Sequence, residues 1–293
     1  MGWHGYLVLW CGVFGAVALI GYGRSLAGMT REQRVVRAKG RIERVGEPRH
    51  GSSPNDGIAV VVSFQDPATG QEFTVTNDGE RGERISAAWK GREIGVHYPR
   101  GRPHAFGFTS DLSAGGRGLG LPTFAVFLVY AGLVVAAAID RGWPWALLGF
   151  CGPWALSGMY HLPGNIRDRN RRLDGLAAMA AVPGRVVAVL KNVSVDADDG
   201  HTSTRLVPVV AFTTLDGTSV TAYCESGLRD PAGSRGLDIT VHYAPDDPAV
   251  FVLDVESERR SWKRDMAVNV VGLLVVAAAA VVGAAAVAGV AEL

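Results

Sequence analysis

Long runs of apolar residues without a charged side chain alternate along this chain with stretches of mixed polarity. Four such runs are present, at residues 3–23, 121–139, 143–162 and 266–290. The first run alone, at about 1.5 Å per residue, reaches about the ~30 Å thickness of a bilayer's hydrocarbon core. Buried helices of soluble domains seldom stay uncharged over such lengths. The pattern therefore predicts four transmembrane helices.

A cleaved signal peptide is the alternative interpretation of the first run. Such a peptide begins with a basic segment, but residues 1–5 contain neither Lys nor Arg. A retained membrane helix is the favoured interpretation.

Two stretches between these runs, residues 39–110 and 183–255, have the pattern of small β modules. Short β-branched or aromatic segments alternate there with Gly, Pro, Asn and Asp, which is typical of strands and turns. The expected strands are residues 40–45, 58–64, 72–76, 93–98 and 105–108 in the first module, and 184–190, 206–213, 219–223, 238–243 and 249–253 in the second. Their spacing predicts antiparallel meanders that close into five-stranded barrels or sandwiches. The expected class is thus an α+β membrane protein.

The two modules also resemble each other in sequence. Residues 91–98, which read Gly-Arg-Glu-Ile-Gly-Val-His-Tyr, return 145 positions later as Gly-Leu-Asp-Ile-Thr-Val-His-Tyr. Such an internal copy predicts a repeated unit of span, module and span. Because about 70 residues form only a marginal core, we expect the modules to pack on each other or on those of a second chain.

Three connecting segments complete the predicted organisation. Residues 24–39 and 167–181 are expected to be helical extensions of the spans, the second ending at Pro183 and Gly184. The Gly-rich residues 113–120 are expected to form a flexible return to the second span.

Basic residues gather beside the apolar runs and predict the orientation in the membrane. They are Arg24, Arg31, Arg34, Arg37, Lys39, Arg41 and Arg44 after the first run, Arg167, Arg169, Arg171 and Arg172 after the third, and Arg259, Arg260, Lys263 and Arg264 before the fourth. With four crossings all of them lie on one side. The positive-inside bias then places the β modules in the cytoplasm and both termini outside, in a cell membrane. The clusters set this orientation, or they also bind anionic headgroups of the lipid bilayer.

The sequence offers little chemistry to a catalytic, cofactor or metal site. His97 and His242 occupy equivalent positions on the outward face of a predicted strand, and the sequence shows no constellation of carboxylate and nucleophile around them. Residues 196–201 begin like a calcium loop, but Val207 stands where a bidentate Glu is needed. Residues 116–120 lack the Lys-Ser/Thr of a phosphate loop. We therefore assign no catalytic, cofactor or metal-binding residue and expect no enzyme and no cofactor.

Charge and cysteine content narrow the partners and the compartment. The net charge of +1 gives no excess that would attract nucleic acid. Cys11, Cys151 and Cys224 have no CxxC spacing, and three thiols cannot all pair, which fits a reducing compartment. The excess of Arg over Lys, with abundant Ala, Gly and Val, is typical of a bacterial genome rich in GC.

Small residues follow one face of the fourth run. Ala280, Ala284 and Ala288 recur at helical spacing beside Gly283. Such a stripe lets helix backbones approach closely, either inside the bundle or in a homodimer.

The modules resemble a known family. Both contain a leading Gly with a Val-rich strand, a Val-x-Val-x-Phe strand or a close variant, a turn with Gly, and Gly-x-x-Ile-x-Val-x-Tyr beside membrane helices. This pattern is similar to the "domain of unknown function 3592" family. The family's Tyr-Asp-Pro is replaced here by Tyr98-Pro99-Arg100 and Tyr243-Ala244-Pro245. The resemblance implies a membrane-tethered β module of uncharacterised role and carries no catalytic residues.

The sequence thus predicts a multi-pass membrane protein that presents two cytoplasmic β modules to another protein. Exposed strand edges and the loops at residues 47–57 and 192–204 are the expected contact surfaces. A channel or transport accessory subunit is the alternative, and a membrane-bound enzyme is third.

Overall fold

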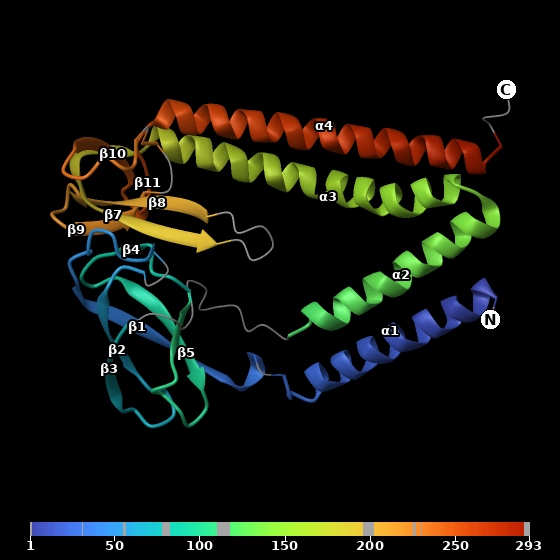
Figure 1. Ribbon diagram of the computed structural model, residues 1–293, viewed down its shortest axis with the longest axis horizontal. Helices are drawn as coiled ribbons and strands as arrows, with labels where there is room; N and C mark the ends of the chain where they lie inside the picture. Colours follow the sequence, from blue (N-terminus) through green and yellow to red (C-terminus); the bar gives the residue numbers. More distant parts are fainter. Residues whose placement is uncertain are drawn as a thin grey trace. The chain divides into compact units, whose positions relative to one another are not determined.

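The computed structural model describes residues 2–30, 32–54, 57–77, 83–109, 118–195, 202–224, 227–228 and 230–289. These residues form four α-helices and two antiparallel sheets, so the mixed α+β class is confirmed (Figure 1). The chain divides into two compact units. A helical unit contains Met1–Arg34, Gly116–Arg172 and Arg260–Leu293, and a β unit contains Val35–Gly115 and Leu173–Arg259.

The four helices follow the four apolar runs. They are α1 (Trp3–Leu26), α2 (Gly120–Arg141), α3 (Pro144–Ala177) and α4 (Val255–Val287). Three of them, α1, α2 and α4, are long and apolar enough to cross a membrane. The helix α3 is not among these three, because its uncharged half contains weakly apolar or polar residues such as Pro153, Tyr160 and His161. Three of the four predicted spans are therefore candidates by length and composition.

Consecutive helices pack at glycines, beginning with α1 and α2. The indole Nε1 of Trp10 donates to the Leu128 carbonyl at 2.9 Å. A Cβ on Gly132 would lie 2.8 Å from the Trp10 ring, so the missing side chain admits the indole.

Glycines also mark the contacts of α3. The Tyr130 hydroxyl of α2 donates to the Gly149 carbonyl. A Cβ on Gly158 would overlap a methyl of Leu273 in α4. At the other end of this pair, a Cβ on Gly283 would lie 3.0 Å from the Pro144 carbonyl oxygen. The helices α3 and α4 accordingly run side by side (Figure 1).

The first sheet has the strand order β3-β2-β1-β5-β6. Its strands are β1 (Val35–Val45), β2 (Val60–Gln65), β3 (Glu72–Thr76), β5 (Glu93–Pro99) and β6 (Gly107–Thr109). A short 3-10 helix, η1 (Glu32–Arg34), precedes β1.

The second sheet has the order β11-β10-β7-β8-β9-β4. Its strands are β7 (Ala180–Val195), β8 (Thr202–Thr213), β9 (Ser219–Tyr223), β10 (Asp238–Ala244) and β11 (Asp247–Val252), together with β4 (Ala87–Ala88) from the first half of the chain. The sequence did not predict β4.

The antiparallel pairing is confirmed, but the simple meander is wrong. In the first sheet β5 pairs with β1 instead of β3, and in the second β10 pairs with β7 instead of β9. The long strands β1 and β7 accept a partner along both edges and therefore occupy the centre. Among the described residues neither sheet closes into a barrel, since β3 and β6 end the first sheet and β11 and β4 end the second.

The predicted helical linkers are half right. The helix α3 does continue to Ala177, but α1 ends at Leu26 and β1 begins at Val35. Gly28 follows α1 with a φ of 69°, a conformation that ends helices readily at glycine. The β-branched Val35 and Val36 then pair with β5. Pro183 and Gly184 lie inside β7 and do not end a helix.

Each central strand contains a glycine where the sheet is most crowded. Gly40 lies opposite Phe64 in β2, and Gly184 lies opposite Phe212 in β8. A Cβ on Gly40 would lie 2.7 Å from Val62, and one on Gly184 would lie 2.6 Å from Val241. Both positions need the absence of a side chain, because neighbouring valines fill the space.

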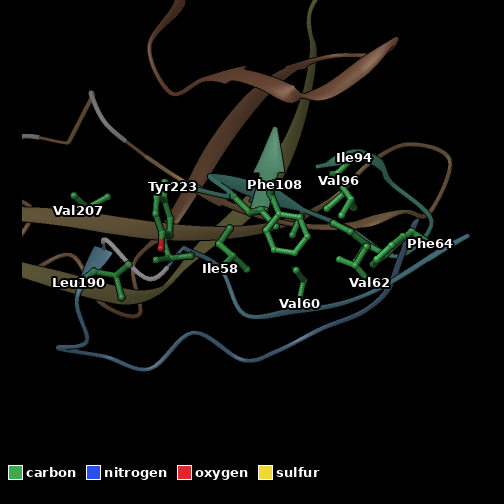
Figure 2. Close-up of a cluster of buried hydrophobic side chains, with 14 of the residues drawn as sticks. Ile58, Val60, Val62, Phe64, Ile94, Val96, Phe108, Leu190, Val207 and Tyr223 are labelled. Carbon is green, nitrogen blue, oxygen red and sulfur yellow. The ribbon is translucent and has the colours of Figure 1, made fainter. Parts of the chain in front are cut away.

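Both halves of the chain contribute to one hydrophobic cluster in the β unit. Figure 2 shows Leu190, Val207 and Tyr223 of the second half gathered with side chains of the first half. The first half supplies Ile58, Val60, Val62, Phe64, Ile94, Val96 and Phe108 to the labelled set. A second cluster lies mainly among β7–β10 and includes Ala87 of β4.

Polar contacts join the same two halves beside β4. The Tyr223 N–H donates to the Ser86 carbonyl at 2.7 Å, and Ala88 lies opposite Thr221. The guanidinium of Arg84 lies 5.5 Å from the centre of the Tyr223 ring. The β unit is thus built from both halves of the chain.

Candidate binding surfaces

The two histidines at matching positions of the sequence lie on the strands β5 and β10. His97 is half-buried on β5 between the buried Val96 and Tyr98. Burial and then the charge of Arg37 lower the pKa of His97 from its ordinary value of 6.5, while Glu83 acts in the opposite direction. His97 is therefore mostly neutral at pH 7. His242 is likewise half-buried on β10.

The other sequence features with possible chemistry can be placed only in part. Residues 196–201, with the beginning of the calcium-like loop, lie outside the described residues, as do Gly116 and Arg117 of the Gly-rich segment. Within the described ranges, no three or more His, Cys, Asp or Glu side chains are grouped so that they could hold a metal ion. Cys11, Cys151 and Cys224 take part in no disulfide bond, and Cys224 is buried.

The loop predicted at residues 47–57 covers part of the second sheet. The Gly51 N–H donates to the Val189 carbonyl at 2.9 Å, and the Lys191 N–H donates to the Ser52 carbonyl at 3.0 Å. The Val189 N–H donates to Nδ1 of His50 at 3.2 Å. These bonds occupy the edge of β7 beyond its pairing with β10, so this loop protects an edge and is a poor candidate for an open contact surface.

The second predicted loop is largely strand. β7 continues to Val195 and β8 begins at Thr202, which leaves only residues 196–201 of the predicted 192–204 between them. The polar composition of the hairpin suggested a loop, whereas its backbone pairs in one unbroken register from Ala188 opposite Val209 to Val195 opposite Thr202.

The edge strand β3 presents backbone groups outward. The Asp66 N–H donates to the Gln71 carbonyl, and the Asn77 N–H donates to the Val60 carbonyl. Hydrogen-bonded and non-hydrogen-bonded pairs alternate in an antiparallel ladder, so Phe73 and Val75 bond to β2 while Thr74 points its N–H and C=O away from it. No described residue pairs with β3 along this outer edge.

The side chains of β3 divide in the same way. Phe73 and Val75 are partly buried and pack against the shared hydrophobic cluster. Glu72, Thr74 and Thr76 are exposed. The strand is therefore anchored on its inner face and polar on its outer face.

The remaining sheet edges are less suited to accept a further strand. β11 contains Pro248, which lacks a donor, and its pairing with β10 has a register shift. β6 has three residues. The carbonyl of Ala87 in the two-residue β4 already accepts a hydrogen bond from the Arg92 guanidinium. β3 is the edge strand that pairs with its neighbour without a register shift over its whole length, Glu72–Thr76.

Comparisons of the chain with protein-family models, with curated proteins and with solved structures found no match. The resemblance to the "domain of unknown function 3592" family remains a prediction that rests on the residues quoted for it.

Proposed function

We propose that this chain is a four-span protein of a bacterial cell membrane whose β unit binds another protein in the cytoplasm. The observation that carries the binding proposal is β3, an anchored edge strand with outward backbone donors and acceptors. An extended segment of a partner can add to such an edge, taking affinity from main-chain hydrogen bonds.

The connectivity of the chain supports the proposed number of crossings. β4 of the first half belongs to the same sheet as β7–β11, so both halves of the β unit must lie on one side of a membrane. The chain between these halves contains α2 and α3. If the apolar α2 crosses, α3 must cross back, although it is less apolar. With α1 and α4 this makes four crossings, and the basic clusters favour a cytoplasmic β unit with both termini outside.

A duplication is supported by matching details of the two sheets. The order β3-β2-β1-β5-β6 corresponds strand for strand to β9-β8-β7-β10-β11. The Gly91 N–H donates to the Ile42 carbonyl and the Gly236 N–H to the Val186 carbonyl, both at 2.7 Å. A register shift follows Ile42 and another follows Val186. We take the two modules to be copies of one unit, related to the family named above.

Thr74→Pro tests strand addition at β3. Proline removes the outward N–H of Thr74, and this N–H takes no part in the ladder to β2, so the sheet should tolerate it better than proline at Phe73 or Val75. Thr74→Val, which keeps the N–H, is the matched control. Proteins crosslinked in the native cell to the full-length membrane protein are quantified for the wild type and both variants.

We expect at least one protein to be recovered equally with wild type and Thr74→Val and about tenfold less with Thr74→Pro, a loss of about 1.4 kcal/mol in binding. The three proteins should have matching thermal unfolding curves. Recovery of every crosslinked protein in undiminished amount with Thr74→Pro would rule out this edge as the binding site.

A further inference from the structure

A cavity of about 520 Å³ lies between α3 and α4 within the helical unit. Its volume falls in the range of about 300–1,000 Å³ that is common for small-molecule sites. The residues that line it change character along its length. Arg169, Arg172, Trp262 and Asp265 line one end, and Leu162, Val270 and Leu273 line the other.

Arg169 makes no ion pair among the described residues. Its Nη1 donates to the thioether sulfur of Met266 at 3.0 Å. Its Nε is buried and has no hydrogen-bond partner among the described residues. A thioether is only a weak acceptor, and an unsatisfied buried donor costs about 1–3 kcal/mol. The guanidinium of Arg169 thus lacks a strong acceptor among the described residues, and the same side chain lines the cavity, where an anion could supply one.

Arg172 adds a second guanidinium at the same end. It stands one helical turn after Arg169, where residues three apart share a helix face, and both line the cavity. Its guanidinium lies 5.0 Å from the centre of the Trp262 ring, which holds the side chain toward α4. Two guanidinium groups suit a phosphate, because each presents a planar fork of donors.

The rest of the cavity distinguishes a phospholipid from a free phosphate. Asn165 and Asn269, between the two ends, provide amide donors suited to ester carbonyls. Leu162, Val270 and Leu273 provide apolar surface that a free phosphate would not use. The residues at the charged end follow the third apolar run and precede the fourth, so the proposed crossings would place this end on the headgroup side of the cavity.

We propose that the cavity between α3 and α4 binds one phospholipid, with its phosphate at Arg169 and Arg172 and its acyl chains toward Leu162 and Leu273. The carboxylate of Asp265 accepts a hydrogen bond from a headgroup amine or hydroxyl. The site therefore prefers phosphatidylethanolamine-type and phosphatidylglycerol-type headgroups over phosphatidylcholine, whose choline group has no N–H or O–H to donate. This inference goes beyond protein binding by the β unit, but it rests on the proposed crossing of α3.

The test measures lipid binding to the delipidated full-length protein by native mass spectrometry. Phosphatidylglycerol, phosphatidylethanolamine and phosphatidylcholine are titrated separately, with inorganic phosphate and glycerol 3-phosphate as probes that lack acyl chains. The double substitution Arg169→Gln and Arg172→Gln removes the proposed phosphate ligands. The matched control is Arg167→Gln with Arg171→Gln, which changes the same charge on the same helix at exposed positions that do not line the cavity.

We expect the cavity substitutions to weaken binding of phosphatidylglycerol about tenfold or more, and the control pair to weaken it less than about threefold. Arg169→Gln alone keeps the contact between Arg172 and Trp262 and serves if the double variant does not fold. An equal loss of phosphatidylglycerol affinity in the control pair would mean that the loss comes from surface charge, and it would contradict binding in the cavity. Equally tight binding of phosphatidylcholine or of inorganic phosphate would also overturn the proposed ligand.

A separate measurement reports on the crossing of α3. In sealed vesicles, a membrane-impermeant maleimide should not label Cys151 if α3 crosses the bilayer. Labelled Cys151 would contradict the crossing. If Cys151 is protected but lipid binding is unselective, the crossing of α3 stands and only the proposed lipid site is contradicted.

Discussion

At the scale of single residues, a buried tyrosine fastens the β2–β3 turn to the first sheet. The Tyr98 hydroxyl, at the end of β5, donates to Oδ1 of Asp66 at 2.9 Å. Asp66 also accepts bonds from the Ala68 N–H and the Thr69 hydroxyl. In the second sheet Tyr243 reaches the corresponding turn, where its hydroxyl accepts the Leu215 N–H at 2.8 Å. Each tyrosine thus joins the turn to its sheet by a specific hydrogen bond.

The same contact makes the stability of the β unit depend on pH. The bond from the Ala68 N–H, followed by those from Tyr98 and Thr69, lowers the pKa of Asp66 below its ordinary value of 3.8. Burial, and next the bond to Asp66, raises the pKa of Tyr98 to about 12. The carboxylate form is therefore favoured by folding, and its stabilising effect is present above pH 3.8 and is lost as the pH falls through the lowered value.

We predict that Asp66→Asn destabilises the protein at pH 7 and that its difference from wild type shrinks as the pH is lowered toward 3. Tyr98→Phe should cost about 1–3 kcal/mol at pH 7, because it removes a hydrogen bond to a charged group. Thermal unfolding followed by circular dichroism across this pH range measures both effects. Asp246→Asn, on the exposed β10–β11 turn, is the control. A difference for Asp66→Asn that stayed constant with pH would contradict the assigned role of its charge.

At the scale of elements, one glycine sets the approach of α3 and α4. Gly283 is buried, and a Cβ there would lie 3.0 Å from Leu147 Cβ and the Leu148 nitrogen as well as the Pro144 oxygen. Ala284, the next residue, is exposed. The small-residue stripe read from the sequence therefore splits, with Gly283 inside the contact and Ala284 outside it.

We predict that Gly283→Leu separates the ends of α3 and α4 and destabilises the protein by about 1–3 kcal/mol, as overpacking usually does. Ala284→Leu should stay within about 0.5 kcal/mol of wild type, as exposed substitutions do. Thermal unfolding in detergent compares the two neighbours. Native mass measurement of Ala284→Leu then addresses the homodimer, because an unchanged assembly size would count against association through this face.

The extent to which the elements could be predicted depends on how local their causes are. β3 and β9 begin and end where the alternation of their side chains predicts. Ala87 and Ala88 carry no strand signal of their own, and they form β4 only because β9 pairs with them.

The cavity residues could not be predicted from the sequence either, because Arg169 and Met266 become neighbours only when α3 and α4 pack. The run at residues 143–162 lacks charge, but its Gly, Pro, Tyr and His content makes it less apolar than its absence of charge suggested.

At the scale of the whole molecule, the β unit joins two segments that are separated by two helices. Ala87 lies opposite Ala222 and Ala88 opposite Thr221. Because the Tyr223 N–H bonds to the Ser86 carbonyl, the neighbouring pair Ala87 and Ala222 is a non-hydrogen-bonded pair. Such pairs have Cα atoms about 4.5 Å apart, a separation that a disulfide tolerates.

We predict that Ala87→Cys with Ala222→Cys, in a chain whose three native cysteines are replaced by Ala, forms an intramolecular disulfide on mild oxidation. Mass spectrometry of the digested monomer identifies the linked peptides. Lys90→Cys with Ala222→Cys is the control, because Lys90 is exposed and follows β4. A crosslink found only between two chains would assign the pairing of modules to a dimer.

The two residues of β4 also bear on how the protein is made. They seal the edge of a sheet whose other strands are all synthesised later, so the second module made alone would leave β9 open to pairing with any exposed strand it meets. The first module is synthesised before the second. Ala87 and Ala88 therefore stay without their strand partner until β9 has been synthesised. Fragments cut between α2 and α3 should therefore stay free of aggregates in detergent only when both are produced together, so neither module should fold stably without the other.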